Sequence, residues 1–480
     1  MFSLTAESAV SLCGTGFPAA TSVARRAARE NTAKMAVPPI KQLRLNTYTE
    51  DKGGNLPACR DGALAAMRRS GLARLEGRTM LPFEKALKTV LDSARRLGSE
   101  RVALARAVNR ILAEDVKSDI DMPPFDKSTR DGYACRRKDL ANELTLIETI
   151  QAGTPPQKAI GPNQCAKIMT GAALPQGADC VIMVEFTRAP AAGAGFTENP
   201  TANTVRFVGE GTDDNLCLKG EDIKAGEVVL QKGTRIRPQH IAVLASVGCT
   251  QPVVSKRPRV AVLATGDELV QPASRPGPSQ IRNSNAFQLA AHIESAGAVA
   301  KNYGIARDTD QAIDRFFKKA VDQSDVVIVS GGVSVGDFDL VPKIFRQNNI
   351  NLLFEKIDVK PGKPTVFGVS EKVYCFGLPG NPVSTFVTFE LLVKPFLYKL
   401  MGYAYAPGNI RMPLCESITR KDIERRSWIP VTITDAGTLK PVEYHGSAHI
   451  NALCTADGLV CIGVGVAEIE KGTIVPVRLI

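Results

Sequence analysis

A glycine-rich turn between an apolar strand and a helix is the stretch of this chain best suited to binding an anion. Lys372–Phe376 predicts a buried strand, Val383–Leu400 predicts a long helix, and the turn Gly377–Pro382 joins them. Asn381 suits the N-cap, and Pro382 suits the first helical position, where a missing N–H costs no hydrogen bond. Backbone N–H groups at the positive end of such a helix stabilise phosphates and oxyanions. A plain strand-to-helix turn is the competing interpretation of this stretch alone.

Two further loops follow predicted strands and carry glycines or acids. Thr265-Gly266-Asp267-Glu268 follows the strand Arg259–Ala264, and the loop from Ser330 to Asp339 follows the strand Asp325–Val329. Ligands of an open parallel sheet bind beyond the carboxyl ends of its strands, so we expect all three loops at one edge. Glycines there allow a close backbone approach, and acids beside an anion site are explained if Mg²⁺ bridges them to phosphate oxygens.

Two lysines add positive charge near the same edge. Lys360 and Lys363 belong to the sequence Lys-Pro-Gly-Lys-Pro, in which the prolines stiffen the backbone. Their ammonium groups would attract an anionic ligand. The alternative is a turn that carries two solvated lysines.

A second group of polar turns lies earlier in the chain. Asp131 stands just before a glycine and an aromatic residue, Thr170 lies in a Thr-Gly-Ala turn, and Asp222 lies in a Gly-Glu-Asp-Ile turn. Turns favour Asp and Thr for local hydrogen-bonding reasons. By themselves these residues are better explained as structural.

The elements that must position these residues alternate between strand and helix after residue 256. Continuous apolar strands alternate there with amphipathic stretches, which predicts a parallel sheet covered on both faces. The predicted helices of this region are Ser284–Ala296, Gln311–Val321 and Leu340–Gln347. Before residue 256 the predicted helices are Phe83–Leu97, Val102–Ala113 and Pro238–Ser246. Between them, short strands dominate residues 119–217. From about residue 406 short alternating strands, such as Ser427–Thr434 and Leu459–Gly463, predict a small β domain.

Length, charge and cysteines narrow the class of protein. A chain of 480 residues has room for several domains with proper cores. Its formal charge is +11, but the first 79 residues alone carry 12 Lys and Arg against six Asp and Glu. The remainder shows no basic clusters with interleaved aromatics, which argues against nucleic-acid binding and for small anions. Eleven cysteines without a C-x-x-C pair predict reduced thiols in a cytoplasm, and no apolar run could span a membrane.

Residues 1–79 differ from the rest of the chain. They are rich in Ala, Arg, Ser and Thr and show little periodicity, which predicts a disordered extension. The arginines at 25, 26 and 29 also fit a transit peptide. Met35 and Met80 are further candidate starts, and we expect order to begin near Met80.

From Met80 to Ile480 the chain resembles the molybdopterin molybdenumtransferases, the MoeA type that includes the E domain of gephyrin. The resemblance rests on nine motifs in the family's order: FDKSTRDGYA, MTGAALPQGAD, GEDI, ATGDEL, IRNSN, SGGVSVGDFD, KPGKP, GLPGNP and HGSAHI. One departure is Thr129-Arg130, where many members have Ala-Met. Residues 1–79 lie outside the resemblance.

The resemblance implies an α/β multidomain fold in four parts. Domain I would be discontinuous, with residues 80–118 and 218–255, and a β-rich domain II would be inserted at 119–217. Domain III at 256–405 would be a doubly wound α/β domain that binds molybdopterin, and domain IV at 406–480 would be a β-barrel. Members form homodimers whose site lies between domain III of one subunit and domains I and II of the other.

The implied reaction takes adenylated molybdopterin and molybdate, cleaves the adenylate with Mg²⁺, releases AMP and yields molybdenum cofactor. The implied catalytic residues are Asp131, Thr170, Asp222, Glu268, Asp337 and Asp339. Of these, Glu268, Asp337 and Asp339 would hold Mg²⁺ or orient water, and which of Asp337 and Asp339 ligates the metal stays open. The implied substrate-binding residues are Ser330, Gly331, Gly332, Ser334, Lys360, Lys363, Pro379, Gly380, Asn381, Arg426 and Ser447. The adenylyltransferase and the molybdoenzymes are further candidate partners.

Several alternatives stay open at this point. A tungstate-inserting paralogue has the same motifs, because the two oxyanions are nearly identical in size and charge. A gephyrin-like scaffold with little catalytic activity is an alternative of a different class. The adenylyltransferase itself and the competence-damage enzymes share the domain III fold, but they lack the region 119–222 that this chain contains.

Overall fold

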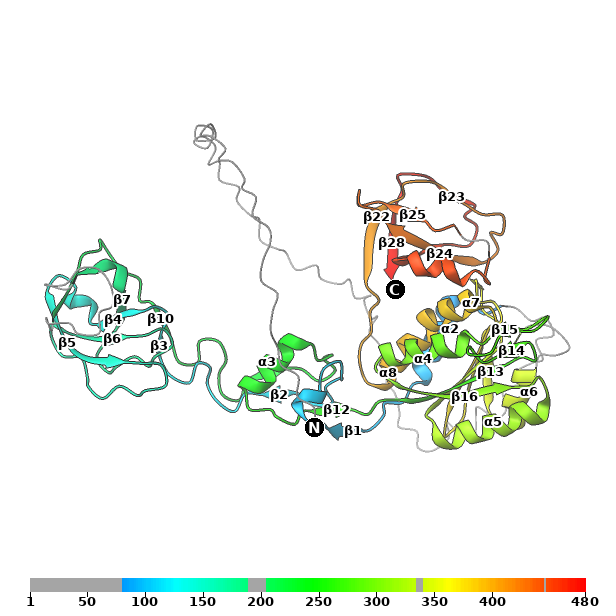
Figure 1. The fold of residues 1–480 in the computed structure, drawn as a ribbon, viewed down its shortest axis with the longest axis horizontal. Coiled ribbons are helices and arrows are strands. Elements are labelled where there is room, and N and C mark those ends of the chain that lie inside the picture. The colour runs from blue at the N-terminus through cyan, green and yellow to red at the C-terminus, as the bar shows by residue number, and fades with distance from the viewer. Residues whose placement is uncertain (1–79, 189–203, 334–339, 444–445) are drawn as a thin grey trace, which may run out of the picture. The chain divides into compact units, whose positions relative to one another are not determined.

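The computed structural model describes residues 80–188, 204–333, 340–443 and 446–480 (Figure 1). The expectations for residues 1–79, and the candidate residues Ser334, Asp337 and Asp339, lie outside these ranges. No helix in the described ranges combines the length and apolar character needed to cross a membrane.

A six-stranded sheet forms the centre of the α/β region, in the order β16-β13-β17-β21-β20-β18. The strands are β13 (Arg259–Thr265), β16 (Val299–Ala306), β17 (Val326–Ser330), β18 (Asn351–Phe354), β20 (Val366–Val369) and β21 (Tyr374–Leu378). The predicted strands β13, β17 and β21 pair in parallel, as expected, whereas β20, which was not predicted, pairs antiparallel with both β18 and β21. A tight turn joins β20 to β21 through a hydrogen bond from the Ser370 N–H to the Val373 carbonyl. Such a turn allows a hairpin but no parallel crossover.

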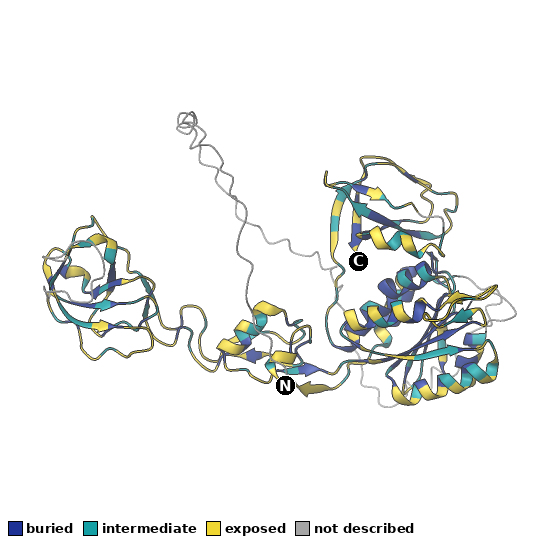
Figure 2. Cartoon of the chain, viewed as in Figure 1, coloured by how far each residue is buried: buried dark blue, intermediate teal, exposed yellow. Residues whose placement is uncertain are grey.

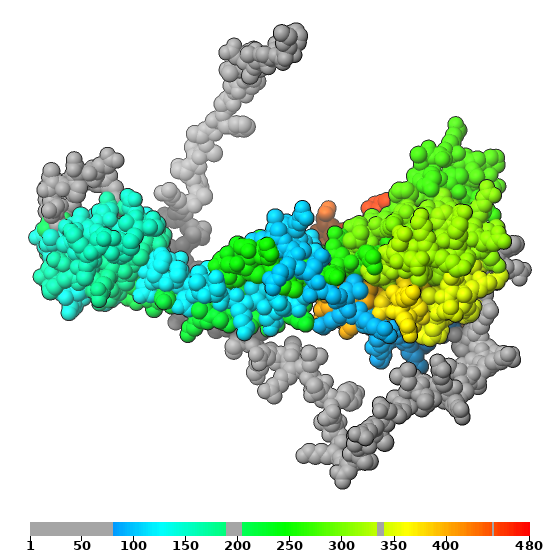
Figure 3. Space-filling view, turned by 90° about the horizontal axis from the view of Figure 1, so that it is seen from below, coloured from blue at the N-terminus to red at the C-terminus, as the bar shows by residue number. Residues whose placement is uncertain are grey.

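Helices cover both faces of this sheet, as the sequence predicted. Helices α4 (Asn285–Ser295), α7 (Pro382–Thr388) and α8 (Lys394–Leu400) pack on the face that includes Val260 and Val262. Helices α5 (Asp310–Gln323) and α6 (Leu340–Gln347) pack on the opposite face. Figure 1 shows the three layers, and Figure 2 shows that the central strands β13, β17 and β21 are buried between them. Figure 3 shows the outer surface seen from below.

The helix that follows the glycine-rich turn is longer and less regular than a single α-helix. Between α7 and α8 lies a π-helical segment, Phe389–Val393. Such segments interrupt α-helices and are frequent at functional sites. The buried Glu390 of this segment pairs with Lys394 and lies 3.5 Å from the ring of His292 on α4.

The N-terminal part of the described chain contains one of its two predicted helices. Helix α2 (Phe83–Ser93) is present, but the predicted helix over 102–113 was wrong. That stretch holds only a 3-10 turn, Leu104–Arg106, because Asn109 takes a left-handed conformation at φ 65°. Ile111 and Leu112 then bridge to other strands. The remaining elements are α3 (Pro238–Ser246), β1 (Ser99–Arg101), β2 (Val116–Lys117), β11 (Val228–Leu230) and β12 (Val253–Ser255).

Two further six-stranded sheets complete the described fold. The first has the order β7-β4-β6-β5-β9-β8, and its strands are β4 (Gly132–Cys135), β5 (Glu143–Ile150), β6 (Gln164–Ile168), β7 (Cys180–Met183), β8 (Thr187–Arg188) and β9 (Thr204–Phe207). The second follows the path β19-β24-β26-β28-β22, with β25 beside β24. Its strands are β19 (Val359–Lys360), β22 (Asn409–Pro413), β24 (Arg426–Ile433), β25 (Leu439–Pro441), β26 (Gly458–Ile462) and β28 (Ile474–Leu479). Lys360 belongs to the C-terminal sheet because β19 pairs with β24, although β19 directly precedes β20 of the α/β sheet in the chain.

Short two-stranded pairs and 3-10 turns fill the connections. The pairs are β3 (Lys127–Ser128) with β10 (Leu216–Cys217), β14 (Leu269–Val270) with β15 (Ile281–Arg282), and β23 (Ile418–Thr419) with β27 (Glu468–Ile469). The 3-10 turns are Arg137–Asp139, Val184–Phe186 and Ile450–Thr455.

Candidate active site

The three predicted loops leave the α/β sheet at one edge. Ser330 is in register with Ala264 of β13 and with Leu378 of β21, so the three strands end together. The Gly331 N–H donates to the Leu378 carbonyl at 3.0 Å. A Cβ on Gly331 would lie 2.4 Å from the Thr265 carbonyl oxygen, and its φ is +98°. Only glycine allows the loops to approach this closely.

Asn285 holds these loops together from the start of α4. Its Nδ2 donates to Ser330 Oγ at 2.9 Å, to the Gly380 carbonyl at 2.7 Å and to Thr385 Oγ1 at 3.4 Å. The Thr385 hydroxyl in turn donates to the Pro379 carbonyl at 2.5 Å. Asn285 is only 9% exposed. Ser330 therefore belongs to a buried network that positions the loops. Asn285 is the last residue of the IRNSN motif but was not among the predicted site residues.

The glycine-rich turn begins a helix at Asn381, as predicted, but its N–H groups are not all free. The Asn381 side chain makes no capping bond and donates instead to Ser447 Oγ at 2.8 Å. The Val383 N–H donates to the Ser447 carbonyl at 3.1 Å. One of the backbone N–H groups expected at this helix N-terminus is therefore already bonded within the protein. Ser447 accepts this bond because the C-terminal segment packs against the turn.

A basic cavity of about 650 Å³ opens beside this turn. It gathers Lys360, Lys363, Pro379, Asn381 and Ser447, all of which are predicted binding residues. Four further cations line it: Lys356, Arg420, Lys421 and Arg425. The rest of the wall includes prolines and the nearly buried Trp428. Six cations around one cavity favour an anionic ligand, and the apolar wall suits a flat organic group.

The cations of the basic cavity differ in what already holds them. The side-chain ammonium groups of Lys356, Lys363 and Lys421 have no hydrogen-bond or ion-pair partner within the described ranges. The Arg420 guanidinium donates to backbone carbonyls, including that of Arg425 at 2.6 Å, and to Ser427 Oγ at 2.7 Å. The three lysines are therefore the side chains most available to a ligand.

Asp422 holds the other two cations of the cavity. Its Oδ2 accepts from Arg425 at 2.5 Å and from Lys360 at 3.2 Å. The hydrogen bond from Arg425, and then that from Lys360, lower the pKa of Asp422 to about 2, although its burial acts in the opposite direction. The carboxyl is therefore ionised at neutral pH.

Arg426, a predicted binding residue, lies outside the basic cavity. Its guanidinium pairs with Glu84 and lies 5.5 Å from the centre of the Phe83 ring, both on α2. Strand pairing explains the placement, because Arg426 opposes Val359 of β19.

Glu268 lies at the sheet edge, on the loop that follows β13. It is exposed, and its carboxylate has no hydrogen bond or ion pair with any described residue. A Cβ on Gly266 would lie 2.5 Å from Glu268 Oε2, so the glycine makes room for that carboxylate. Among the described residues, no three His, Cys, Asp or Glu side chains gather as metal ligands. Glu268 is thus one available oxygen ligand, and its two expected companions lie outside the described ranges.

The earlier group of polar turns is only partly brought together. Asp131 Oδ1 accepts from the Thr170 N–H at 2.7 Å and from its hydroxyl at 2.9 Å. These hydrogen bonds, the backbone one first, lower the pKa of the Asp131 carboxyl. Both residues are exposed. Asp222 is exposed on a separate turn, which its N–H anchors through a 3.0 Å bond to the Met122 carbonyl.

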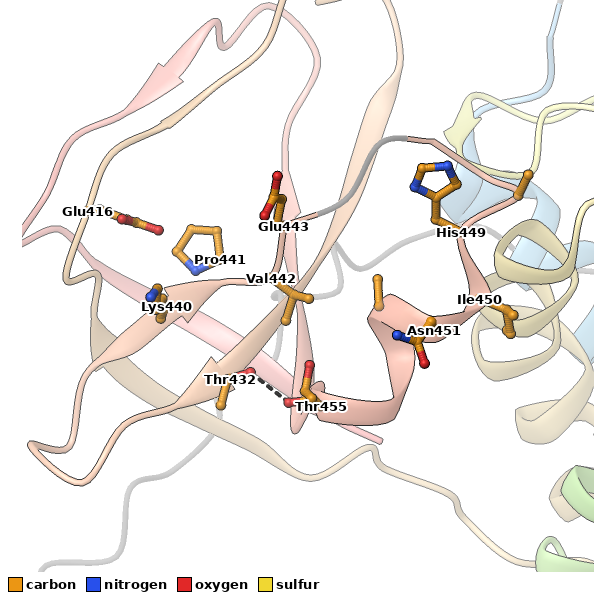
Figure 4. A pocket seen from close by; sticks show the side chains of 12 residues that line it. Glu416, Thr432, Lys440, Pro441, Val442, Glu443, His449, Ile450, Asn451 and Thr455 are labelled. Atoms are coloured by element: carbon orange, nitrogen blue, oxygen red, sulfur yellow. Dashed lines mark hydrogen bonds between the residues drawn. The ribbon is translucent and has the colours of Figure 1, made fainter.

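A second cavity, of about 970 Å³, lies within the C-terminal region (Figure 4). Its wall carries side chains of both charges, including Glu416, Lys440 and Glu443. A hydrogen bond of 2.6 Å from the Thr432 hydroxyl to the Thr455 carbonyl crosses its floor. None of the predicted site residues lines it, so we assign the chemistry to the basic cavity and the sheet edge.

Comparison with known proteins places these features in a family. Residues 81–248 match the family model for the MoeA N-terminal region (domain I and II), 261–399 match the probable molybdopterin binding domain, and 415–480 match the MoeA C-terminal region (domain IV). A curated molybdopterin molybdenumtransferase of Staphylococcus epidermidis is 36% identical over 415 residues, covering 84% of this chain and 97% of the relative. One of Staphylococcus aureus is 35% identical with the same coverage.

Solved structures show the same relationship. Two crystal structures of the molybdopterin biosynthesis MoeA protein from Pyrococcus horikoshii match with TM-scores of 0.70 and 0.72 at 32% and 30% identity. Each match covers 84% of this chain, and 99% and 100% of those chains respectively. The α/β multidomain fold expected from the sequence is thereby confirmed.

Proposed function

Because the chain belongs to the molybdopterin molybdenumtransferase family, whose members act in molybdenum cofactor biosynthesis, we propose that it transfers molybdenum from molybdate to molybdopterin. The organic substrate would be adenylated molybdopterin. Cleavage of its adenylate would release AMP as the molybdenum is placed on the dithiolene sulfurs.

The basic cavity is the observation that carries this proposal. Both substrates are anions, and six lysine and arginine side chains line a space of about 650 Å³. The ammonium groups of Lys356, Lys363 and Lys421 would bind the oxyanion, since no described residue competes for them. The apolar wall with Trp428 would lie against the uncharged part of the substrate.

The sheet edge would position the second part of the substrate. Gly331 allows close backbone approach there, and the Asn285 hydrogen bonds to Ser330 and to the Gly380 carbonyl keep both loops in place. A rigid loop arrangement supports catalysis because it holds the reacting groups before the chemical step begins. Ser330 would act through this network, since it is buried and bonded to Asn285.

Glu268 would be one ligand of a Mg²⁺ ion, with Asp337 and Asp339 completing the protein's share. The free carboxylate above Gly266 fits a hard cation, because Mg²⁺ prefers oxygen ligands. When bound, the ion would offset the charge that develops on the phosphate oxygens during cleavage. Glu268 would also orient water near the adenylate.

Asp131, Thr170 and Asp222 would complete the site from a second subunit. Asp131 and Thr170 form one hydrogen-bonded unit, and the depressed pKa keeps that carboxylate ionised. Exposure of all three side chains allows them to meet another subunit. The working form would therefore be a homodimer with two shared sites.

The experiment that tests this function measures AMP release by the purified chain. Adenylated molybdopterin should yield AMP only when molybdate and Mg²⁺ are both present, and native mass spectrometry should then detect molybdenum-loaded cofactor. A parallel arm replaces molybdate with tungstate to measure metal preference. Loss of AMP release when either molybdate or Mg²⁺ is left out would support the proposal. AMP release that does not depend on molybdate would contradict it.

A further inference from the structure

Asp422 stands in an unusual place for an acid, because it contacts the cations of a proposed anion site. It lies on the loop between β23 and β24 and is 26% exposed. Its Oδ2 bridges the Arg425 guanidinium and the Lys360 ammonium, at 2.5 Å and 3.2 Å. Its Oδ1 accepts from the Glu424 N–H at 3.2 Å. Both carboxylate oxygens are thus engaged, and the side chain is held in one orientation.

The carboxylate reaches these cations from the far side of the cavity wall. A neighbouring cavity of about 410 Å³ shares Lys363, Lys421 and Arg425 with the basic cavity. Asp422 and Glu424 line this neighbouring cavity but do not line the basic one. An anion bound in the basic cavity would therefore meet the cations on one side while Asp422 holds them on the other.

Two opposite effects of Asp422 on anion binding must be compared. Its negative charge repels an anion nearby, which would weaken binding. Against this, lysine and arginine side chains have many rotamers, and clustered cations repel one another towards solvent. A fixed carboxylate behind the wall offsets that repulsion and reduces the ordering needed when a ligand binds.

From this arrangement we infer that Asp422 is a positioning residue for the oxyanion site, holding Lys360 and Arg425 in the orientation that an oxyanion needs. The inference rests on the proposed function of the basic cavity and adds a residue that the family resemblance did not supply. Asp422 contacts no substrate; it acts through the two cations.

The test compares two variants that remove the same charge from the same loop. Asp422→Asn removes the carboxylate that bonds Lys360 and Arg425, whereas Glu424→Gln removes an exposed carboxylate that bonds neither. Dissociation constants for molybdate and for AMP are measured on the full chain at one ionic strength. Charge alone predicts tighter binding in both variants. Positioning predicts that Asp422→Asn binds about tenfold more weakly while Glu424→Gln stays close to wild type.

A second readout needs no ligand. The rate at which an amine-acylating reagent modifies Lys360 is followed by mass spectrometry, with the exposed Lys372 as the internal reference. Loss of the hydrogen bond to Asp422 frees the Lys360 ammonium, so Lys360 should react about threefold faster in Asp422→Asn but not in Glu424→Gln.

The outcomes separate cleanly. Weaker anion binding together with faster labelling in Asp422→Asn supports the inference, and the probe that is affected shows whether molybdate or the phosphate of AMP occupies this part of the site. Binding as tight as that of Glu424→Gln, or tighter, overturns it. Wild-type protein that binds neither probe would remove the oxyanion site itself and so count against the proposed function, while the labelling rates would still show whether Asp422 restrains Lys360.

Discussion

At the scale of single residues, the site separates side chains that bind from side chains that hold other groups in place. The Lys363 ammonium has no partner within the described ranges and lines the basic cavity, so it is available to a ligand. Asn285 and Ser330 are buried and bond one another. Changes at the two kinds of residue should therefore have different kinetic consequences.

Lys363→Ala and Glu268→Gln should affect different steps. Removing the Lys363 ammonium should weaken binding of the anionic substrate by roughly 1.5–3 kcal/mol, about ten- to hundredfold, because the contact exists before the chemical step. Glu268→Gln keeps the shape and removes a charge, so it should weaken Mg²⁺ dependence and slow AMP release with binding largely retained. Separate measurements of substrate affinity and single-turnover AMP release distinguish them.

The β20–β21 hairpin offers matched controls for this pair. Lys372→Ala and Glu371→Gln make the same changes at exposed positions that line neither the basic cavity nor the sheet edge. Both should bind and turn over like wild type. If Lys363→Ala and Glu268→Gln also did so, the sheet edge and the basic cavity would not be the active site.

Asn285→Ala should destabilise the loops and slow the reaction without removing any group that touches substrate. The change leaves Ser330 Oγ, the Gly380 carbonyl and Thr385 Oγ1 without their common donor. Buried polar groups without partners cost about 1–3 kcal/mol, so thermal unfolding should begin at a lower temperature. Asn409→Ala, at an exposed position of β22, is the control. An unchanged melting curve would show that the network contributes little.

The sequence predicted the site residues that follow strands better than those supplied by another sheet. Asn381 could be predicted because strand ends of a parallel sheet gather ligands. Lys360 and Lys363 could be predicted from the two cations of the Lys-Pro-Gly-Lys-Pro sequence, although Lys360 belongs to β19 of the C-terminal sheet. Arg420, Lys421 and Arg425 were missed, although the stretch 420–426 is dense in basic residues. Which of those cations faces the cavity depends on the pairing of β24 with β19. In that pairing the Arg426 side chain contacts Glu84 of α2 and does not line the cavity. That pairing joins segments far apart in the chain and has no local signal.

At the scale of elements, local periodicity succeeded where one face of a helix is buried. The predicted helices Pro238–Ser246 and Leu340–Gln347 were confirmed at their predicted bounds. The stretch 102–113 has a similar apolar spacing, but Ile111 and Leu112 are buried by bridges to other strands. A short apolar stretch can be buried either as a helix or as a strand, so contacts with distant residues determine the secondary structure of 102–113.

The π-helical segment contains a buried acid, Glu390, that has no role in the proposed mechanism. Glu390 has a side chain 3% exposed and pairs with Lys394 at 2.8 Å. Its burial opposes ionisation, but His292 and Lys394 outweigh this effect and lower the pKa of its carboxyl below the ordinary 4.5. The cluster therefore joins α4 to the long helix through charge as well as packing.

Glu390→Gln should destabilise the protein by about 3 kcal/mol, because it leaves the Lys394 ammonium, on a side chain only 19% exposed, without its counter-charge. Its dependence on pH should follow from the depressed pKa. The stabilisation is present above the unfolded pKa near 4.5 and is lost as pH falls through the lower folded pKa. Wild type and variant should thus differ in unfolding free energy at pH 7 and converge below pH 4.5. Denaturant unfolding at both pH values measures this, with Glu371→Gln as the control.

At the scale of the whole molecule, the candidate residues fall on separate sheets. Asp131 and Thr170 lie beside β4 and β6, whereas Lys363 lies between the α/β sheet and the C-terminal sheet. The proposed homodimer provides a reason for this distribution, because two subunits can each contribute part of one site. The described contacts connect Asp131 to Thr170 but to none of the cations of the basic cavity.

A mixed dimer tests whether each site is shared. Asp131→Asn and Lys363→Ala subunits, carrying different affinity tags, are co-expressed, and the dimers are tested for AMP release. If a site takes Asp131 from one subunit and Lys363 from the other, each mixed dimer contains one site without either substitution. Random pairing then restores about a quarter of wild-type activity, and purified mixed dimers about half. Sites built within one chain would instead give only the mean of the two defective variants. If sedimentation showed only a stable monomer and that monomer released AMP at the full rate, the shared site would be excluded.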